Sequence, residues 1–153
     1  MLEYRLTELA RKLPSIDFTP TQQRLGDAGY DLKACIPVKS VRIHPGEVIK
    51  IPTGIHVGLG REDLVGLVIP RSSLGKNGGV LANTVGVIDS NYQGEIVLMV
   101  LNTNMEEDLV ILQGERIAQL VVVNCFTNTF SMVDEFGYIT NRGEEGFGSS
   151  GKV

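Results

Sequence analysis

The chain has 153 residues, of which 42% are hydrophobic, and a formal net charge of −4 at pH 7. This length suits one domain with a sizeable core, and no apolar run is long enough to cross a bilayer. The negative charge argues against a broad nucleic-acid-binding face, although local donors can still hold a small phosphorylated ligand. The first 13 residues lack a signal-peptide core, so we expect a cytoplasmic protein with neither a membrane nor a nucleic-acid partner.

At the N-terminus, Leu2, Leu6, Leu9 and Leu13 recur at helical spacing, but a strand fits this segment equally well. Cys35 follows, far from Cys125 and outside any CxxC pair, so we expect two buried, reduced thiols. The chain has only two histidines, which nearly excludes a histidine-rich zinc site.

Short β-branched or alternating segments dominate the rest of the chain, at intervals of about 8–12 residues. They predict strands over residues 38–43, 47–51, 54–59, 64–69, 95–101, 108–112 and 116–123, with a weaker one over 129–133. One short helical turn is expected over 72–77, with Ser72 or Ser73 near its N-cap. The pattern is typical of an all-β antiparallel sandwich or jelly roll.

The tail after about Phe136 has a different composition, rich in glycine and poor in apolar side chains. Such a segment buries too little surface to order itself, so we expect it to be mobile in the free protein. Its glycines, the Ser149 and Ser150 hydroxyls and the Arg142 guanidinium suit phosphate oxygens, and Phe147 suits stacking on a base. A lid that orders over a nucleoside triphosphate is one interpretation; a disordered terminus without a role is the other.

Four internal segments carry polar side chains next to predicted strands. Residues 70–75 place a guanidinium and two hydroxyls after a strand, and residues 86–96 place a carboxylate and an aromatic ring between two strands. Residues 26–32 and 114–119 each pass as a turn that enters a strand. Taken singly, each segment is explained by local turn chemistry.

Taken in order, five segments resemble the five motifs of the trimeric dUTPase family, and together they are highly specific. They are AGYDL at 28–32, PRSSLG at 70–75, GVIDSNYQGE at 86–95, GERIAQL at 114–120 and RGEEGFGSSG at 142–151. The resemblance implies a β jelly roll of the β-clip type over residues 1–135 and a mobile arm over 136–153 that closes over an active site. It also implies a homotrimer with three active sites, each assembled from segments of all three subunits.

The activity implied by this resemblance is hydrolysis of dUTP to dUMP and pyrophosphate, by Mg²⁺-assisted attack of water on the α-phosphorus. Such an enzyme limits uracil incorporation into DNA and supplies dUMP for thymidylate synthesis. Asp89 matches the general base, which also binds the 3′-hydroxyl of the sugar. Tyr92 matches the ring that excludes a 2′-hydroxyl. Asn83, with the backbone of Gly86, Val87 and Ile88 and near Met99, matches the edge that reads uracil.

The phosphate ligands are implied in the same way. Arg71, Ser72, Ser73 and Gln119 match the group around the α- and β-phosphates, and Asp31 matches the aspartate that steadies Arg71 and the metal through water. The γ-phosphate and uracil contacts in the arm match Arg142, Phe147, Gly148, Ser149 and Ser150.

Three positions depart from the family pattern. Asn91 stands where many members have a second acid, Glu145 replaces a glycine, and Ser150 replaces a threonine. Two rival functions stay open: a dCTP deaminase, which shares the RSSLG segment, and a non-catalytic nucleotide sensor on the same fold.

Overall fold

The structure is a computed structural model of the chain, and it describes residues 1–144. Along these residues, strands far outnumber helices. Their order is β1 (Glu3–Leu6), α1 (Glu8–Arg11), β2 (Gly29–Lys33), β3 (Ser40–Ile43), β4 (Val48–Gly58), β5 (Leu64–Pro70), α2 (Ser72–Lys76), β6 (Gly79–Leu81), β7 (Gly86–Ile88), β8 (Glu95–Asn102), β9 (Leu109–Leu112) and β10 (Arg116–Asn124).

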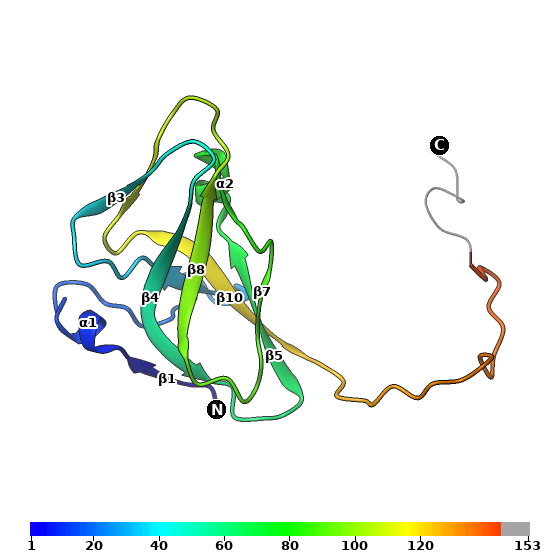
Figure 1. Cartoon of the computed structure of the whole chain (residues 1–153). Helices are drawn as coiled ribbons and strands as arrows, with labels where there is room; N and C mark the ends of the chain where they lie inside the picture. Colours follow the sequence, from blue (N-terminus) through cyan, green and yellow to red (C-terminus); the bar gives the residue numbers. More distant parts are fainter. Residues whose placement is uncertain (145–153) are drawn as a thin grey trace.

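The strands form two four-stranded sheets and one two-stranded sheet, and all the pairings are antiparallel. The first sheet has the order β1-β4-β8-β6, the second has the order β2-β10-β5-β7, and β3 pairs with β9. Figure 1 shows these strands gathered into one body, from which residues 125–144 extend away. The predicted class, an antiparallel jelly roll, is confirmed.

The core is built from side chains that alternate along the central strands. In β8, Ile96, Leu98 and Val100 are buried while the residues between them are half-buried or exposed. This period of two is the one that the sequence shows. The buried amide of Asn102 donates to the carbonyls of Ile43 (2.9 Å) and Glu107 (2.8 Å), so this core polar group is satisfied.

The strands predicted over 47–51 and 54–59 are one long strand, β4. Gly54 lies at φ 77°, and the pairing with β8 shifts register between Pro52 and His56. The carboxylate of Glu95 on β8 accepts a hydrogen bond from the Gly54 N–H (2.8 Å). A bulge therefore keeps the strand continuous across the two residues that local pattern alone interprets as a break.

The N-terminal segment contains both of the structures left open by its sequence. β1 pairs with β4, and α1 follows as one turn whose N-cap, Thr7, accepts a hydrogen bond from the Ala10 N–H (3.2 Å). The predicted helical turn after β5 is present as α2, but its N-cap is Arg71 and no side chain caps it. Neither helix within residues 1–144 has the length and hydrophobicity of a membrane span.

The strand predicted over 129–133 is wrong. Residues 125–144 contain no helix or strand, and Phe126, Phe130 and Met132 are almost fully exposed. Strand propensity needs a neighbouring strand to pair with, and the described part of this chain offers none to this segment.

Both cysteines are free thiols, as predicted, but only Cys35 is fully buried, whereas Cys125 is half-buried at the end of β10. Burial raises the pKa of the Cys35 thiol to about 11. We therefore assign Cys35 to packing, because a thiol is an active nucleophile only as the thiolate.

Candidate functional site

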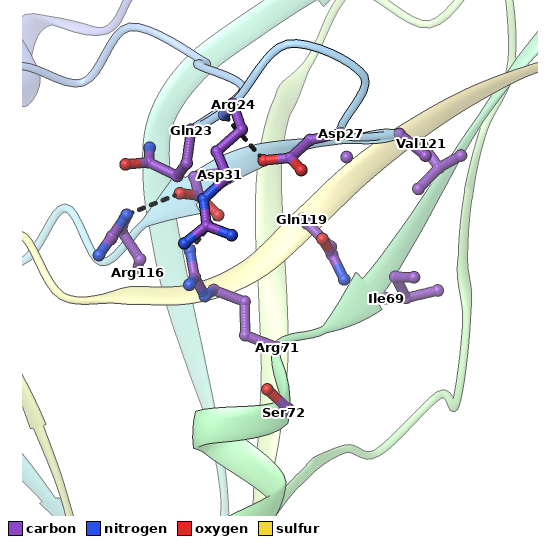
Figure 2. A pocket seen from close by; sticks show the side chains of 12 residues that line it. Gln23, Arg24, Asp27, Asp31, Ile69, Arg71, Ser72, Arg116, Gln119 and Val121 are labelled. Carbon is purple, nitrogen blue, oxygen red and sulfur yellow. Dashed lines mark hydrogen bonds and ion pairs between the residues drawn. The ribbon is translucent and has the colours of Figure 1, made fainter.

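A large concavity lies over the sheet β2-β10-β5-β7, and we call it the arginine pocket. Its volume is about 730 Å³. Three arginines and two aspartates supply its charges, so it is locally positive although the chain is negative. Figure 2 shows its lining, which consists of Gln23, Arg24, Asp27, Ala28, Gly29, Asp31, Ile69, Arg71, Ser72, Arg116, Gln119 and Val121.

A buried carboxylate organises two of the arginines. Asp31 on β2 is only 5% exposed, and its two oxygens accept hydrogen bonds from Arg71 and from Arg116, the latter at 3.1 Å. A charge at this depth needs such partners. Asp31 therefore holds two guanidinium groups in place at the pocket wall before any ligand arrives.

The polar floor of the pocket depends on a glycine. The side chain of Gln119 on β10 lies against Gly29 of β2, and a Cβ added to Gly29 would come within 3.0 Å of the Gln119 Cδ atom. Gly29 thus leaves the space in which the Gln119 amide faces the pocket. Ser72 opens α2 at the opposite wall, with the exposed Ser73 beside it.

A second, narrow concavity lies where the two large sheets meet at their edge strands, and we call it the hairpin cavity. Its volume is about 30 Å³. Its lining is mostly apolar side chains and backbone from β5, β6, β7 and β8, namely Val68, Leu81, Asn83, Gly86, Ile88, Ile96, Val97 and Leu98.

The turn between β6 and β7 is strained. Thr84 has φ 62°, an outlier for a β-branched residue, and the Val85 N–H donates to the Asn83 carbonyl (2.8 Å) around it. The Ala82 N–H donates to the carbonyl of Met99 on β8 (2.8 Å), which fixes the turn to the neighbouring strand. Strain of this kind persists where the surrounding structure holds it, often at binding sites. Here it presents Asn83 at the rim of the hairpin cavity.

Asp89 and Tyr92 occupy the turn that follows β7. The Tyr92 N–H donates to the Asp89 carbonyl (3.0 Å), and the Tyr92 hydroxyl donates to the Glu95 carbonyl (3.0 Å). The ring lies so close over Gly94 that an added Cβ would be 2.8 Å from its Cε2 atom. Asp89 is exposed and lines neither concavity of the single chain.

The two concavities lie on opposite faces of the same strand. Ile69 of β5 lines the arginine pocket, whereas Val68, its neighbour, lines the hairpin cavity. Successive side chains of a strand point to opposite faces. The sheet therefore separates the two concavities within one chain.

The predicted site residues thus fall into separate groups. The arginine pocket gathers Asp31, Arg71, Ser72 and Gln119, and the hairpin cavity gathers Asn83, Gly86 and Ile88, with Val87 exposed on the same strand. Arg142 belongs to the segment 125–144, which contains no helix or strand. The predictions for Phe147, Gly148, Ser149 and Ser150 fall outside the described residues.

Four polar lining residues of the arginine pocket were not assigned to the site from the sequence: Gln23, Arg24, Asp27 and Arg116. Arg116 lies within the GERIAQL segment, so a positive charge inside a motif could have indicated that it belongs to the site. The other three lie in the loop before β2, where only the polar composition of residues 21–24 hints at a surface role.

Comparisons with known proteins point in one direction. The sequence matches the dUTPase family profile over residues 18–151. It is 46% identical over 127 residues to the deoxyuridine 5′-triphosphate nucleotidohydrolase of Hydrogenovibrio crunogenus, with 82% of each chain covered. It is 43% identical over 134 residues to the protein of the same name from Klebsiella pneumoniae, with 87% of this chain and 86% of the relative covered.

Solved structures give the same picture. A mutant dUTPase of Staphylococcus bacteriophage 80alpha with dUpNHpp matches with a TM-score of 0.83 and 28% identity, covering 99% of this chain and 98% of that one. A mutant dUTPase from phage phi11 of S. aureus, described as revealing the coordination of a structural Mg(II) ion, matches with a TM-score of 0.74 and 25% identity. That match covers 90% of this chain and 99% of the phage protein.

Proposed function

This chain belongs to the dUTPase family and hydrolyses dUTP, and from this premise we propose that it releases dUMP and pyrophosphate by attack of water on the α-phosphorus. Phosphoryl transfer depends mainly on positioning and on stabilising negative charge. The observation that carries the proposal is the arginine pocket, where guanidinium, hydroxyl and amide donors converge on a chain that is negative overall. In the cell, this reaction would limit uracil in DNA and supply dUMP for thymidylate synthesis.

The arginine pocket would bind the triphosphate. Arg71 offers a bidentate fork to phosphate oxygens, and Ser72, Ser73 and Gln119 add neutral donors around the α- and β-phosphates. Asp31 keeps the Arg71 fork oriented through their ion pair. The donors are thus already in position, so binding requires little rearrangement.

The hairpin that surrounds the hairpin cavity would bind the nucleoside. Asn83, the backbone of Gly86, Val87 and Ile88 and the backbone near Met99 would pair with the uracil edge, because a backbone edge cannot easily move aside for cytosine. Tyr92 would pack against the sugar and leave no room for a 2′-hydroxyl. Asp89 would bind the 3′-hydroxyl and accept the proton of the attacking water.

The positions of the two concavities support a site shared between chains. Because they face opposite sides of β5, one nucleotide would reach both most directly if the arginine pocket of one chain met the hairpin cavity of another. Such head-to-tail contacts close into rings. A homotrimer with three shared active sites would provide this arrangement.

The C-terminal arm would complete each site. We propose that residues 1–135 form the rigid domain and that residues 136–153 close over the bound nucleotide, with Arg142, Gly148, Ser149 and Ser150 at the γ-phosphate and Phe147 on the uracil. Deleting residues 142–153 should leave the protein folded and assembled but nearly inactive. A fully active truncation would rule out the lid.

Magnesium fits this site only as an ion carried by the substrate. Both oxygens of Asp31 are committed to arginines, and residues 1–144 contain no cluster of three or more histidine, cysteine, aspartate or glutamate side chains that could hold a metal. When bound to the triphosphate, Mg²⁺ neutralises phosphate charge. The contribution of Asp31 would be made through water and through its orientation of Arg71.

The decisive experiment measures pyrophosphate release from dUTP with Mg²⁺, with UTP and dCTP as matched substrates. We expect rapid release of pyrophosphate from dUTP only, because the site recognises both the base and the sugar. Ammonia release from dCTP would instead indicate a deaminase. Binding of dUTP without release of pyrophosphate would indicate a nucleotide sensor.

A further inference from the structure

The loop before β2 places a third cation in the arginine pocket. Residues 21–28 form a loop whose two ends are held close together, because the Asp31 N–H donates to the Thr21 carbonyl (2.9 Å). Arg24 from this loop lines the pocket together with Arg71 and Arg116. In the view of Figure 2 its side chain runs from the loop toward Asp31 and Arg71.

The loop is braced from within. The Arg24 N–H donates to the Asp27 carboxylate (2.9 Å), the Asp27 N–H donates to the Arg24 carbonyl (3.2 Å), and the Gln22 amide donates to the Asp27 carbonyl. Gly26 between them takes φ 94°, which a side chain would disfavour. The backbone that carries Arg24 is therefore fixed by its own contacts.

The three arginines of the pocket differ in their partners. Arg71 and Arg116 share the carboxylate of Asp31. The guanidinium of Arg24 has no hydrogen bond or ion pair with any residue in 1–144, and the nearby Asp27 carboxylate binds backbone instead. A third guanidinium beside two others is unfavourable unless an anion joins them, since like charges repel.

We propose that Arg24 is a substrate-binding residue that contacts the distal, β- and γ-phosphate end of the triphosphate. This proposal rests on the assignment of the arginine pocket to the phosphates. Arg71, Ser72 and Gln119 line the sheet and the start of α2, whereas Arg24 reaches in from the loop above them. Arg24 therefore adds one charge-assisted contact from the rigid body of the enzyme, independent of the arm.

The test measures the dissociation constants of two ligands by calorimetry: a non-hydrolysable α,β-imido analogue of dUTP with Mg²⁺, and dUMP. Arg24→Gln should weaken the analogue by about tenfold, as expected for a hydrogen bond to a charged group, and should leave dUMP within about twofold. Arg24→Lys should recover part of the loss, because it keeps the charge but not the fork.

Arg11→Gln is the matched control, because Arg11 is an exposed arginine on α1 that lines none of the concavities described above. It should bind both ligands as the wild type does. Unchanged affinity of Arg24→Gln for the analogue, or an equal loss for dUMP, would overturn the role of Arg24 while the wild type still hydrolyses dUTP. A wild type that does not hydrolyse dUTP would overturn the proposed function itself, so the two failures are distinguishable.

Discussion

The arginine pocket and the hairpin cavity share the strand β5 but differ in size, in polarity and in the kind of ligand group that they suit. The first is wide and polar, and two of its three arginines are held by one buried carboxylate. The second is narrow and largely apolar, and its shape comes from edge-strand backbone and a strained turn at Thr84. A charged phosphate chain is bound by prepositioned donors, whereas a flat base is distinguished by shape and backbone hydrogen bonds. Mutations in the two regions should therefore alter different kinetic constants.

The largest effect should come from Asp89, which lies beside the hairpin cavity but is proposed to act on a phosphate. Asp89→Asn should reduce kcat by about 10²–10⁴-fold, the usual contribution of a placed base, while the affinity for the imido analogue stays close to that of the wild type. Single-turnover kinetics and calorimetry measure the two quantities separately. Unchanged turnover would remove Asp89 from the chemistry.

Mixed assemblies test whether the two concavities that form one site come from different chains. Arg71→Gln should damage the arginine pocket and Asp89→Asn should damage the nucleoside side, so each protein alone should be nearly inactive. If sites are shared, co-expression followed by purification through two affinity tags, which selects mixed trimers, should restore activity at about one site in three around each ring. Mixed trimers that form but stay inactive would show that each chain completes its own site.

Two glycine substitutions distinguish the two concavities at a smaller scale. In Gly29→Ala the new methyl group meets the Gln119 side chain in the arginine pocket. We expect KM for dUTP to rise by about fivefold, which corresponds to one hydrogen bond of about 1 kcal/mol, with no change in selectivity between dUTP and UTP.

Gly94→Ala is the counterpart in the nucleoside region, because its methyl group displaces the Tyr92 ring. The preference for dUTP over UTP should fall by about tenfold, since discrimination by one small group in a tight pocket is worth about that much. Steady-state kinetics with both nucleotides measure each variant. If both variants altered only KM, or both altered only selectivity, the proposal that one concavity binds the phosphates and the other selects the nucleoside would be wrong.

The sequence predicted the longer strands well because their hydrophobic period is local, but it did not predict the short strand β6. The prediction of strands failed where a residue far away in the sequence determines the local structure. Pro52 and Gly54 are locally a break, yet β4 continues through them, and the Gly54 N–H donates to the Glu95 carboxylate of the neighbouring strand β8. Residues 129–133 have strand composition, yet nothing in the described chain pairs with them.

In the functional site, too, the residues in local motifs could be predicted, whereas those placed by long-range contacts could not. Motif residues such as Asp31, Arg71 and Gln119 were identified from the sequence and lie together in the pocket. Arg24 was not, because its place depends on the bridge between Thr21 and Asp31 and on the Asp27 carboxylate that braces the loop. Local composition carries no sign of either contact.

The smallest effect should come from a region outside both concavities, the small sheet β3-β9. Hydrogen bonds from Arg42 and then His44 lower the pKa of Asp108, which precedes β9, below its ordinary value of 3.8. Because the folded pKa is the lower one, the contact stabilises the protein above pH 3.8, and this stabilisation is lost as the pH falls through the folded value. Asp108→Asn should therefore lower Tm slightly at pH 6, by no more than a few degrees for so exposed a cluster, and the difference in Tm from the wild type should be smaller at pH 3.

KM, kcat and nucleotide selectivity of Asp108→Asn should match the wild type at pH 7, because no residue of this cluster lines the arginine pocket or the hairpin cavity. Thermal unfolding monitored by circular dichroism at the two pH values, together with steady-state kinetics, measures both parts. A change in selectivity without a change in Tm would mean that the small sheet communicates with the nucleoside region. The separation of function into two concavities on opposite faces of β5 would then be incomplete.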